Sequence, residues 1–253
     1  MTSPFPDQRP ARVRVEWGLS GALQLLGPDG SSSLVVVVDV LSFSTAVTVA
    51  CDQGVVVHPY PHRDRAGAEA LAARLGAALA QPRGDGRLSL SPASLLRLRG
   101  GRLVLPSPNG ATIAHGLAGT GATVAAGCLR NASAVARTAT EHLAADARND
   151  VVLVPAGERW PDGALRPCLE DLLGVGAIAA ALRDDDLSSE ARAATRLWLA
   201  TPDPAATVRD ATSGRELTAA GWSDDVTIAT DLDATGTVAR LVDHGEGPAF
   251  TTT

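Results

Sequence analysis

Four segments of this 253-residue chain place polar or acidic side chains where a strand would give way to a helix. In the first, VVVVDVLSFSTAV, an apolar run ends at Asp39, and Ser44 and Thr45 follow at the start of the next element. A carboxylate at a strand end can hold a divalent cation, and hydroxyl and N–H groups at a helix start can bind phosphate oxygens. The alternative is that Asp39 closes a turn or caps the helix, and the residue type alone does not choose between the two.

The second and third segments offer amide and guanidinium groups. In LPSPNGATIAHGL, a turn at Asn109 and Gly110 leads into a helix whose first N–H groups could cradle an anion. In GCLRNASAVA, Arg130 and Asn131 occupy the same kind of junction and could reach an anion. Taken alone, the second segment is more typical of an ordinary strand-to-helix turn with an Asn cap, and Arg130 of a solvated residue at a helix start.

The fourth segment, PAGERWPDGALRPCLEDLLGVG, contains four acids, of which Glu158, Glu170 and Asp171 are candidates for a site. Glu158 comes just after a buried strand, as Asp39 does, whereas Glu170 and Asp171 open a helix. Acids in the first turn of a helix are favoured by the helix dipole without any function. Carboxylates that converge from separate strand ends also suit Mg²⁺, which takes one or two of them and keeps several waters.

The basic residues exclude several kinds of chemistry. All 22 are arginine, so Schiff-base catalysis and a phosphate-binding P-loop lysine are ruled out. The net charge is −6 and no run of basic residues occurs, which argues against nucleic acid as a partner. A small anionic substrate stays compatible with this composition, because a few local donors suffice to bind it.

The remaining composition predicts a cytoplasmic protein that does not enter a membrane. Residues 1–18 are polar and no apolar run approaches membrane-spanning length. The three cysteines, Cys51, Cys128 and Cys168, are far apart and form no C-x-x-C motif, so we expect them to be buried and reduced.

Short β-rich runs alternate with Ala-rich helical stretches, which is typical of an α/β fold. In such a fold the loops at the carboxyl ends of the strands form the ligand site. We expect strands at 12–17 (an edge strand), 34–39, 55–58, 102–105, 123–126, 151–155 and 238–242. We expect helices at 44–53, 64–80, after 109, and at 131–145, 171–183, 188–200 and 205–220, a long loop at 82–101 and a frayed tail at 245–253.

Taken together, these segments resemble the 2-phosphosulfolactate phosphatase family of coenzyme M biosynthesis. The four segments and a fifth, SGRELTAAGWSDDV, follow in the family's order from about residue 35 to 242. The resemblance implies a single three-layer α/β/α unit with a mixed sheet and two related lobes, about 1–120 and 121–253. It places the active site at strand carboxyl ends between the lobes.

The resemblance also implies a magnesium-dependent phosphatase that acts on 2-phosphosulfolactate or a related phospho-hydroxy acid, with a homodimer as the assembly to test. By similarity, the catalytic candidates are Asp39 and Glu158, and the Mg²⁺ candidates are Asp39, Glu170 and Asp171. The candidates for phosphate contacts are Ser44, Thr45, Asn109, Gly110, Arg130 and Asn131.

One position departs from the family's pattern, which usually reads DVLR-x-S/T where this chain has Ser42. Serine cannot supply the bidentate, charged contact of an arginine, so the sulfonated substrate is left open. Arg130 or Arg159 could compensate from another loop.

Two other functions are compatible with parts of the pattern. One is a non-catalytic protein that binds small anions on the same fold. The other is a haloacid-dehalogenase-like phosphatase. We disfavour it because such enzymes typically have an acid at the position of Leu41 and usually use a lysine, and this chain has no lysine.

Overall fold

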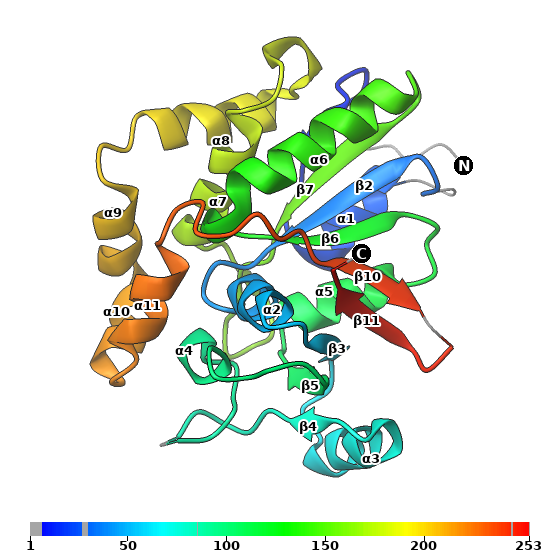
Figure 1. Cartoon of the computed structure of the whole chain (residues 1–253). Helices are drawn as coiled ribbons and strands as arrows, with labels where there is room; N and C mark the ends of the chain where they lie inside the picture. The colour runs from blue at the N-terminus through cyan, green and yellow to red at the C-terminus, as the bar shows by residue number, and fades with distance from the viewer. Residues whose placement is uncertain (1–6, 27–29, 85, 244, 253) are drawn as a thin grey trace.

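The computed structural model describes residues 7–26, 30–84, 86–243 and 245–252 (Figure 1). A nine-stranded mixed sheet runs through the molecule in the order β1-β7-β2-β6-β10-β11-β3-β5-β4, with helices on both of its faces. The predicted α/β class with helices on either side of a mixed sheet is confirmed. The strands of the sheet are β1 Val13–Val15, β2 Ser33–Val38, β3 Val56–Tyr60, β4 Ala78–Leu79, β5 Arg102–Pro106, β6 Thr123–Gly127, β7 Asp150–Pro155, β10 Arg240–Asp243 and β11 Pro248–Thr251.

The helices follow the strands in α/β alternation up to residue 179, and the last third of the described chain is mainly helical. Helices α9, α10 and α11 lie together at one side of the molecule (Figure 1). The helices are α1 Gly18–Leu26, α2 Phe43–Asp52, α3 Arg65–Leu75, α4 Pro92–Leu95, α5 Gly110–Leu117, α6 Ala132–Ala145, α7 Leu169–Ala179, α8 Ser189–Leu199, α9 Pro204–Asp210, α10 Thr212–Ala219 and α11 Ser223–Ala229.

The sheet consists of two parallel halves that run in opposite directions. Strands β1, β7, β2 and β6 are parallel to one another, and so are β3, β5 and β4. The antiparallel hairpin of β10 and β11 joins the two halves, because β10 is antiparallel to β6 and β11 is antiparallel to β3. Strands from either side of residue 120 alternate in the first half, whereas the second half is built from residues 56–106 alone.

The four valines before Asp39 are buried on both faces of the sheet, as their continuous apolar run predicts. Val36 and Val38 pack with side chains of α6, α7 and α8, whereas Val35 and Val37 pack with α1 and α5. In the other half, α2 and α4 cover one face and α3 covers the opposite face. The three cysteines are buried and form no disulfide, as predicted.

Several predicted elements differ from the structure at their ends. The helix expected over 64–80 stops at Leu75, because Gly76 takes a left-handed conformation with φ 58° and the chain then forms β4. The expected helix at 205–220 is two helices separated at Ala211. Helix α11 and the small hairpin of β8 (Glu158–Arg159) and β9 (Leu165–Arg166) were not predicted.

The prediction of a frayed tail at 245–253 is wrong. Residues Pro248–Thr251 form β11 in the middle of the sheet, between β10 and β3. Phe250 is completely buried there, and its ring lies 5.9 Å from the ring of Phe43 at an edge-to-face angle of 67°. Phe250 therefore anchors the tail in the core. The tail is short and Phe250 is followed by three threonines, so the sequence gives no pattern that predicts a strand there.

We therefore expect Phe250→Ala to destabilise the whole domain. Removing a fully buried phenylalanine costs about 3–5 kcal/mol, through lost apolar burial and the cavity left behind. Chemical denaturation followed by circular dichroism measures this loss, and Leu199→Ala, at a side chain that is 72% exposed, is the control. Equal stabilities of the two variants would show that the tail does not belong to the core.

Candidate active site at the ends of strands β2, β5 and β7

Asp39 joins the starts of two helices. Its Oδ1 accepts a hydrogen bond from the N–H of Phe43 at 2.9 Å, and its Oδ2 accepts one from the N–H of Gly110 at 3.2 Å. Phe43 and Gly110 are the first residues of α2 and α5. The first N–H groups of a helix have no partner within the helix and attract negative charge. A side chain at position 110 is excluded, because a Cβ there would lie 2.3 Å from the Phe43 ring.

This contact requires a bent sheet. In the strand order, β2 and β5 are five spacings apart (β2-β6-β10-β11-β3-β5), which is about 24 Å in a flat sheet. The two halves also run in opposite directions, so a flat sheet would place their carboxyl ends on opposite edges. The joining hairpin pairs with β6 through only two residue pairs and with β3 through one. The sheet bends at these short junctions and brings the two carboxyl ends together.

Asp171 makes a second connection between strand ends. Its Oδ1 accepts from the N–H of Val40 at 2.8 Å and its Oδ2 accepts from the N–H of Gly157 at 2.8 Å. These N–H groups follow β2 and β7, so the first turn of α7 holds both loops. Glu170, the preceding residue, is also buried. Both acids therefore face the protein interior and not solvent.

Asp39, Asn109 and Glu158 line a common cavity of about 330 Å³. They come from the ends of β2, β5 and β7, as the sequence predicts for a site at strand carboxyl ends. Nδ2 of Asn109 donates to Oε2 of Glu158 at 2.8 Å. The Oδ1 of Asn109 is buried and has no hydrogen-bond partner among the described residues, so it is free to accept a donor or a cation. The other lining residues are Leu41, Ser42, Arg83, Leu90, Ser107, Pro108, Ser213, Glu216 and Leu217.

The acids of this region favour protonation. The pKa of Asp39 is raised to about 7, chiefly by burial and also by the charges of Glu158 and Glu170, against the lowering effect of the two N–H donors. Burial also raises the pKa of Glu158, and it raises that of Asp171 well above its ordinary value, with the charges of Asp39 and Glu170 adding to it. Near neutral pH the cluster therefore takes up protons or attracts a cation.

Ser44 and Thr45, predicted to contact phosphate, are completely buried in the turn after β2. The Ser44 hydroxyl donates to the Val37 carbonyl and accepts from the Asp39 N–H, while the Thr45 hydroxyl donates to the Val40 carbonyl. Neither residue lines the cavity beside Asp39. These hydroxyls fix the turn that presents Asp39.

Arg130 and Asn131 also lie outside this cavity. The amide of Asn131 bonds to the backbone of Cys128, Ala126 and Thr237, so it fixes the turn before α6. Arg130 donates to the Ile228 carbonyl and lies 3.8 Å from an Asp52 carboxylate oxygen. The structure thus brings Asp39, Asn109 and Glu158 together in one cavity. Arg130 and Asn131 lie outside it.

Arg83 is the arginine that lines the cavity, and the sequence analysis did not single it out. Its Nη2 donates to the Ser42 hydroxyl at 2.9 Å, and its Nε lies 3.3 Å from Oδ2 of Asp225. Arg159, proposed as a substitute cation, is exposed, donates to the Gly163 carbonyl and does not line the cavity. Arg83 belongs to the long loop predicted at 82–101, which has no periodicity that would predict which residue turns inward.

The sequence comparisons identify the family. The family model described as 2-phosphosulpholactate phosphatase matches residues 24–244, most of the 253-residue chain. The chain belongs to the 2-phosphosulpholactate phosphatase family. It is 33% identical over 153 residues to a Deinococcus radiodurans protein named "Probable 2-phosphosulfolactate phosphatase". This match covers 59% of the chain and 60% of the relative, so the chain spans less than two thirds of the relative's length.

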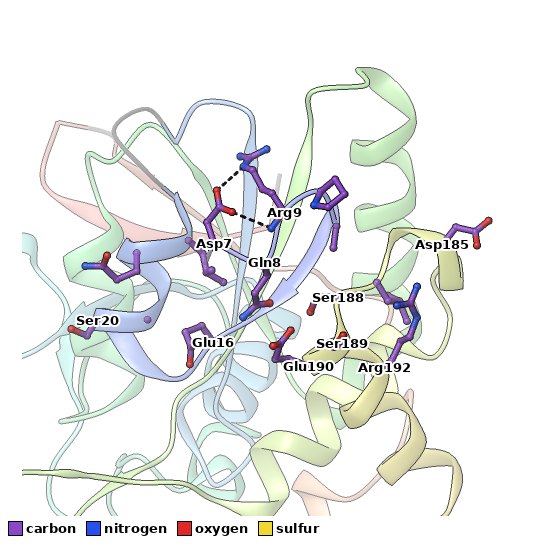
Figure 2. Close-up of a pocket in the computed structure, with 16 residues that line it drawn as sticks. Asp7, Gln8, Arg9, Glu16, Ser20, Asp185, Ser188, Ser189, Glu190 and Arg192 are labelled. Atoms are coloured by element: carbon purple, nitrogen blue, oxygen red, sulfur yellow. Dashed lines mark hydrogen bonds and ion pairs between the residues drawn. The ribbon is translucent and has the colours of Figure 1, made fainter. Parts of the chain in front are cut away.

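The family match includes every residue of the cavity beside Asp39. A larger cavity of about 830 Å³ lies beside Asp7, Gln8 and Arg9, α1 and the start of α8 (Figure 2). Figure 2 shows Glu16 and Glu190 near its centre, and none of the predicted site residues lines it. The cavity beside Asp39 is the candidate site because side chains from three strand ends converge in it, although it is the smaller of the two.

Two further properties concern metal and membrane. Among the residues that the structure describes, no three His, Cys, Asp or Glu side chains are arranged to hold a metal ion as they stand. Mg²⁺ does not need three, because it binds through one or two carboxylates and retains waters. Within the same described ranges, no helix has the length and apolar character needed to cross a membrane.

We expect Asp39→Asn to flatten the pH dependence of stability. The pKa of Asp39 is about 7 in the folded protein against 3.8 for an ordinary aspartate, so between about pH 4 and 7 the folded state holds a proton that the unfolded chain has lost. The stability from this group is present below pH 4 and is lost as pH rises through 7. Asn resembles the protonated acid at every pH.

At pH 4 the free energies of unfolding of wild type and Asp39→Asn should be similar. At pH 8 the variant should be relatively more stable, by roughly 1–4 kcal/mol. Urea titrations at both pH values measure the difference. Asp185→Asn, at an exposed carboxylate, is the control, and an Asp39→Asn curve parallel to that of wild type would contradict the buried, proton-binding state.

Proposed function

We propose that this chain hydrolyses the phosphate monoester of a small acidic compound, either 2-phosphosulfolactate or a related phospho-hydroxy acid. Family membership and the name of the Deinococcus relative support the reaction class. The observation that carries the proposal is that Asp39 and Glu158, two carboxyl groups with raised pKa, line one cavity with Asn109. Phosphate ester hydrolysis needs one group to accept a proton and another to donate one.

Asp39 is suited to be the proton acceptor. A general base works best when its pKa lies near the working pH, and the pKa of Asp39 is about 7. In the proposed step a water molecule attacks phosphorus and transfers a proton to the Asp39 carboxylate. The N–H groups of Phe43 and Gly110 hold that carboxylate in place.

Glu158 is suited to be the proton donor. Burial raises its pKa, so a larger fraction of the group is protonated than for an ordinary glutamate. As the bond between phosphorus and the ester oxygen breaks, the Glu158 proton passes to that oxygen and the alcohol leaves. The hydrogen bond from Asn109 orients Glu158 for this transfer.

We also propose Mg²⁺ as the cofactor. The residues fit it, because carboxylates that raise one another's pKa are stabilised by a cation, and the Asn109 Oδ1 is a buried acceptor without a partner in the described chain. Asp39 and Oδ1 of Asn109 would hold the ion, with Glu170 and Asp171 adding negative charge behind Asp39. The ion would supply positive charge to the phosphoryl oxygens.

Asp39→Asn should reduce turnover by about 10²–10⁴-fold, because the amide cannot accept the proton. Phosphate released from 2-phospholactate and from p-nitrophenyl phosphate, with and without Mg²⁺, measures this loss. Asp185→Asn is the matched control. Release near the wild-type rate by Asp39→Asn would contradict the role of Asp39, and wild-type binding without release on these substrates would favour a non-catalytic anion-binding protein.

Mg²⁺ should raise the melting temperature of the wild-type protein at pH 8 by several degrees, because a ligand present at about 100 times its Kd adds about 2.7 kcal/mol to stability. The shift should be much smaller for Asp39→Asn, which loses the anionic ligand, than for Glu158→Gln, which loses the proton donor. Differential scanning fluorimetry measures it without relying on activity. Equal shifts in the three proteins would place the ion elsewhere.

A further inference from the structure

We propose that Arg83 binds the acidic substituent on the carbon skeleton of the substrate, a carboxylate or a sulfonate, and not the phosphoryl group. The inference rests on the proposed function and assigns the part of the same site that selects an acidic substrate. It stands on the position of Arg83, on the way its guanidinium is held, and on the balance of charge in the cavity.

Arg83 stands between two cavities. It lines the cavity of Asp39 and Glu158, and it also lines a neighbouring cavity of about 350 Å³ that contains His62 and Arg63. Leu90, Ser107 and Pro108 belong to both linings as well, so the cavities share one wall. Asp39 and Glu158 line only the first cavity. A substrate with its reacting group at these two carboxyls would therefore direct its other end toward Arg83.

Buried partners orient the Arg83 guanidinium. Asp225, which is 1% exposed, lies 3.3 Å from its Nε. Asp225 is itself fixed by hydrogen bonds from the Ser91 hydroxyl and the Ala93 N–H. Within the described chain these contacts and the bond to Ser42 occupy Nε and Nη2, two positions of a group that carries five N–H donors. Donors thus remain for a planar or tetrahedral oxyanion, which arginine binds in bidentate fashion.

The charge balance gives Arg83 its role. The described lining of the reactive cavity contains three acids, Asp39, Glu158 and Glu216, and Arg83 is its one arginine. Arg166, whose charge acts on Glu158, lies outside the lining and pairs with Glu216 at 3.2 Å. An anion that enters this acidic cavity gains its favourable side-chain charge from Arg83. The phosphoryl group has to lie at Asp39 and Glu158 to react, so the second acidic group is the one left for Arg83.

The test compares substrates with and without a second acidic group. For 2-phospholactate, Arg83→Gln should raise KM by about tenfold or more with kcat changed much less. For p-nitrophenyl phosphate, which carries only the phosphoryl anion, kcat/KM should stay within about threefold of wild type. Arg83→Lys keeps the charge but loses the planar fork, so its KM should be intermediate. Arg87→Gln, in the same loop but outside the cavity, is the control for net charge.

Equal losses on both substrates, or no loss on either, would overturn the proposal. Melting temperatures separate misfolding from lost contacts, and Arg83→Lys preserves a cation beside buried Asp225 if Arg83→Gln unfolds. Calorimetry gives a readout without turnover: Arg83→Gln should weaken binding of 2-phospholactate and leave binding of inorganic phosphate unchanged. Absence of hydrolysis by the wild type would contradict the proposed function alone. The assignment of Arg83 would be contradicted if Arg83→Gln bound 2-phospholactate as tightly as the wild type, or if the wild type did not bind it measurably.

Discussion

The carboxylate of Asp39, bound by the N–H groups of Phe43 and Gly110, is the contact on which the rest of the site depends. It connects the first turns of α2 and α5, which follow strands from opposite halves of the sheet. Without this junction, two parallel halves that run in opposite directions would present their carboxyl ends far apart. The contact at Asp39 therefore depends on the way the sheet bends across the β10–β11 hairpin.

This arrangement has an electrostatic consequence. Asp39, Glu170 and Asp171 lie in the interior within range of one another's charge, and Glu158 adds a further acid at the cavity. Buried like charges destabilise a fold unless they are protonated or paired with a cation. Asp171 is compensated by two backbone N–H groups that hold neighbouring loops. The pKa values of Asp39, Glu158 and Asp171 nevertheless stay raised, and of these three groups Asp39 and Glu158 line the cavity, where a reaction can use the destabilisation.

Local patterns predicted much of this molecule, and long-range contacts account for what they missed. The valine run before Asp39, the strand ends at Asn109 and Glu158 and the burial of the cysteines follow from periodicity and turn chemistry. The pairing of Phe250 with Phe43 and the contact of Arg83 with Ser42 depend on where a tail and a loop return to the core. No pattern in residues 82–101 distinguishes Arg83 from its neighbours. Whether Ser44 and Thr45 face a ligand or the interior is likewise decided by packing across the bent sheet.

The central claim is that Asp39 is a buried carboxyl group poised to exchange a proton near neutral pH. Carbon-13 NMR of the aspartate carboxyl carbons, with the Asp39 signal assigned by its absence in Asp39→Asn, reports this titration directly. The account predicts a midpoint near pH 7 for the metal-free protein, shifted to lower pH when Mg²⁺ is added. A midpoint near 4 that Mg²⁺ does not move would contradict it.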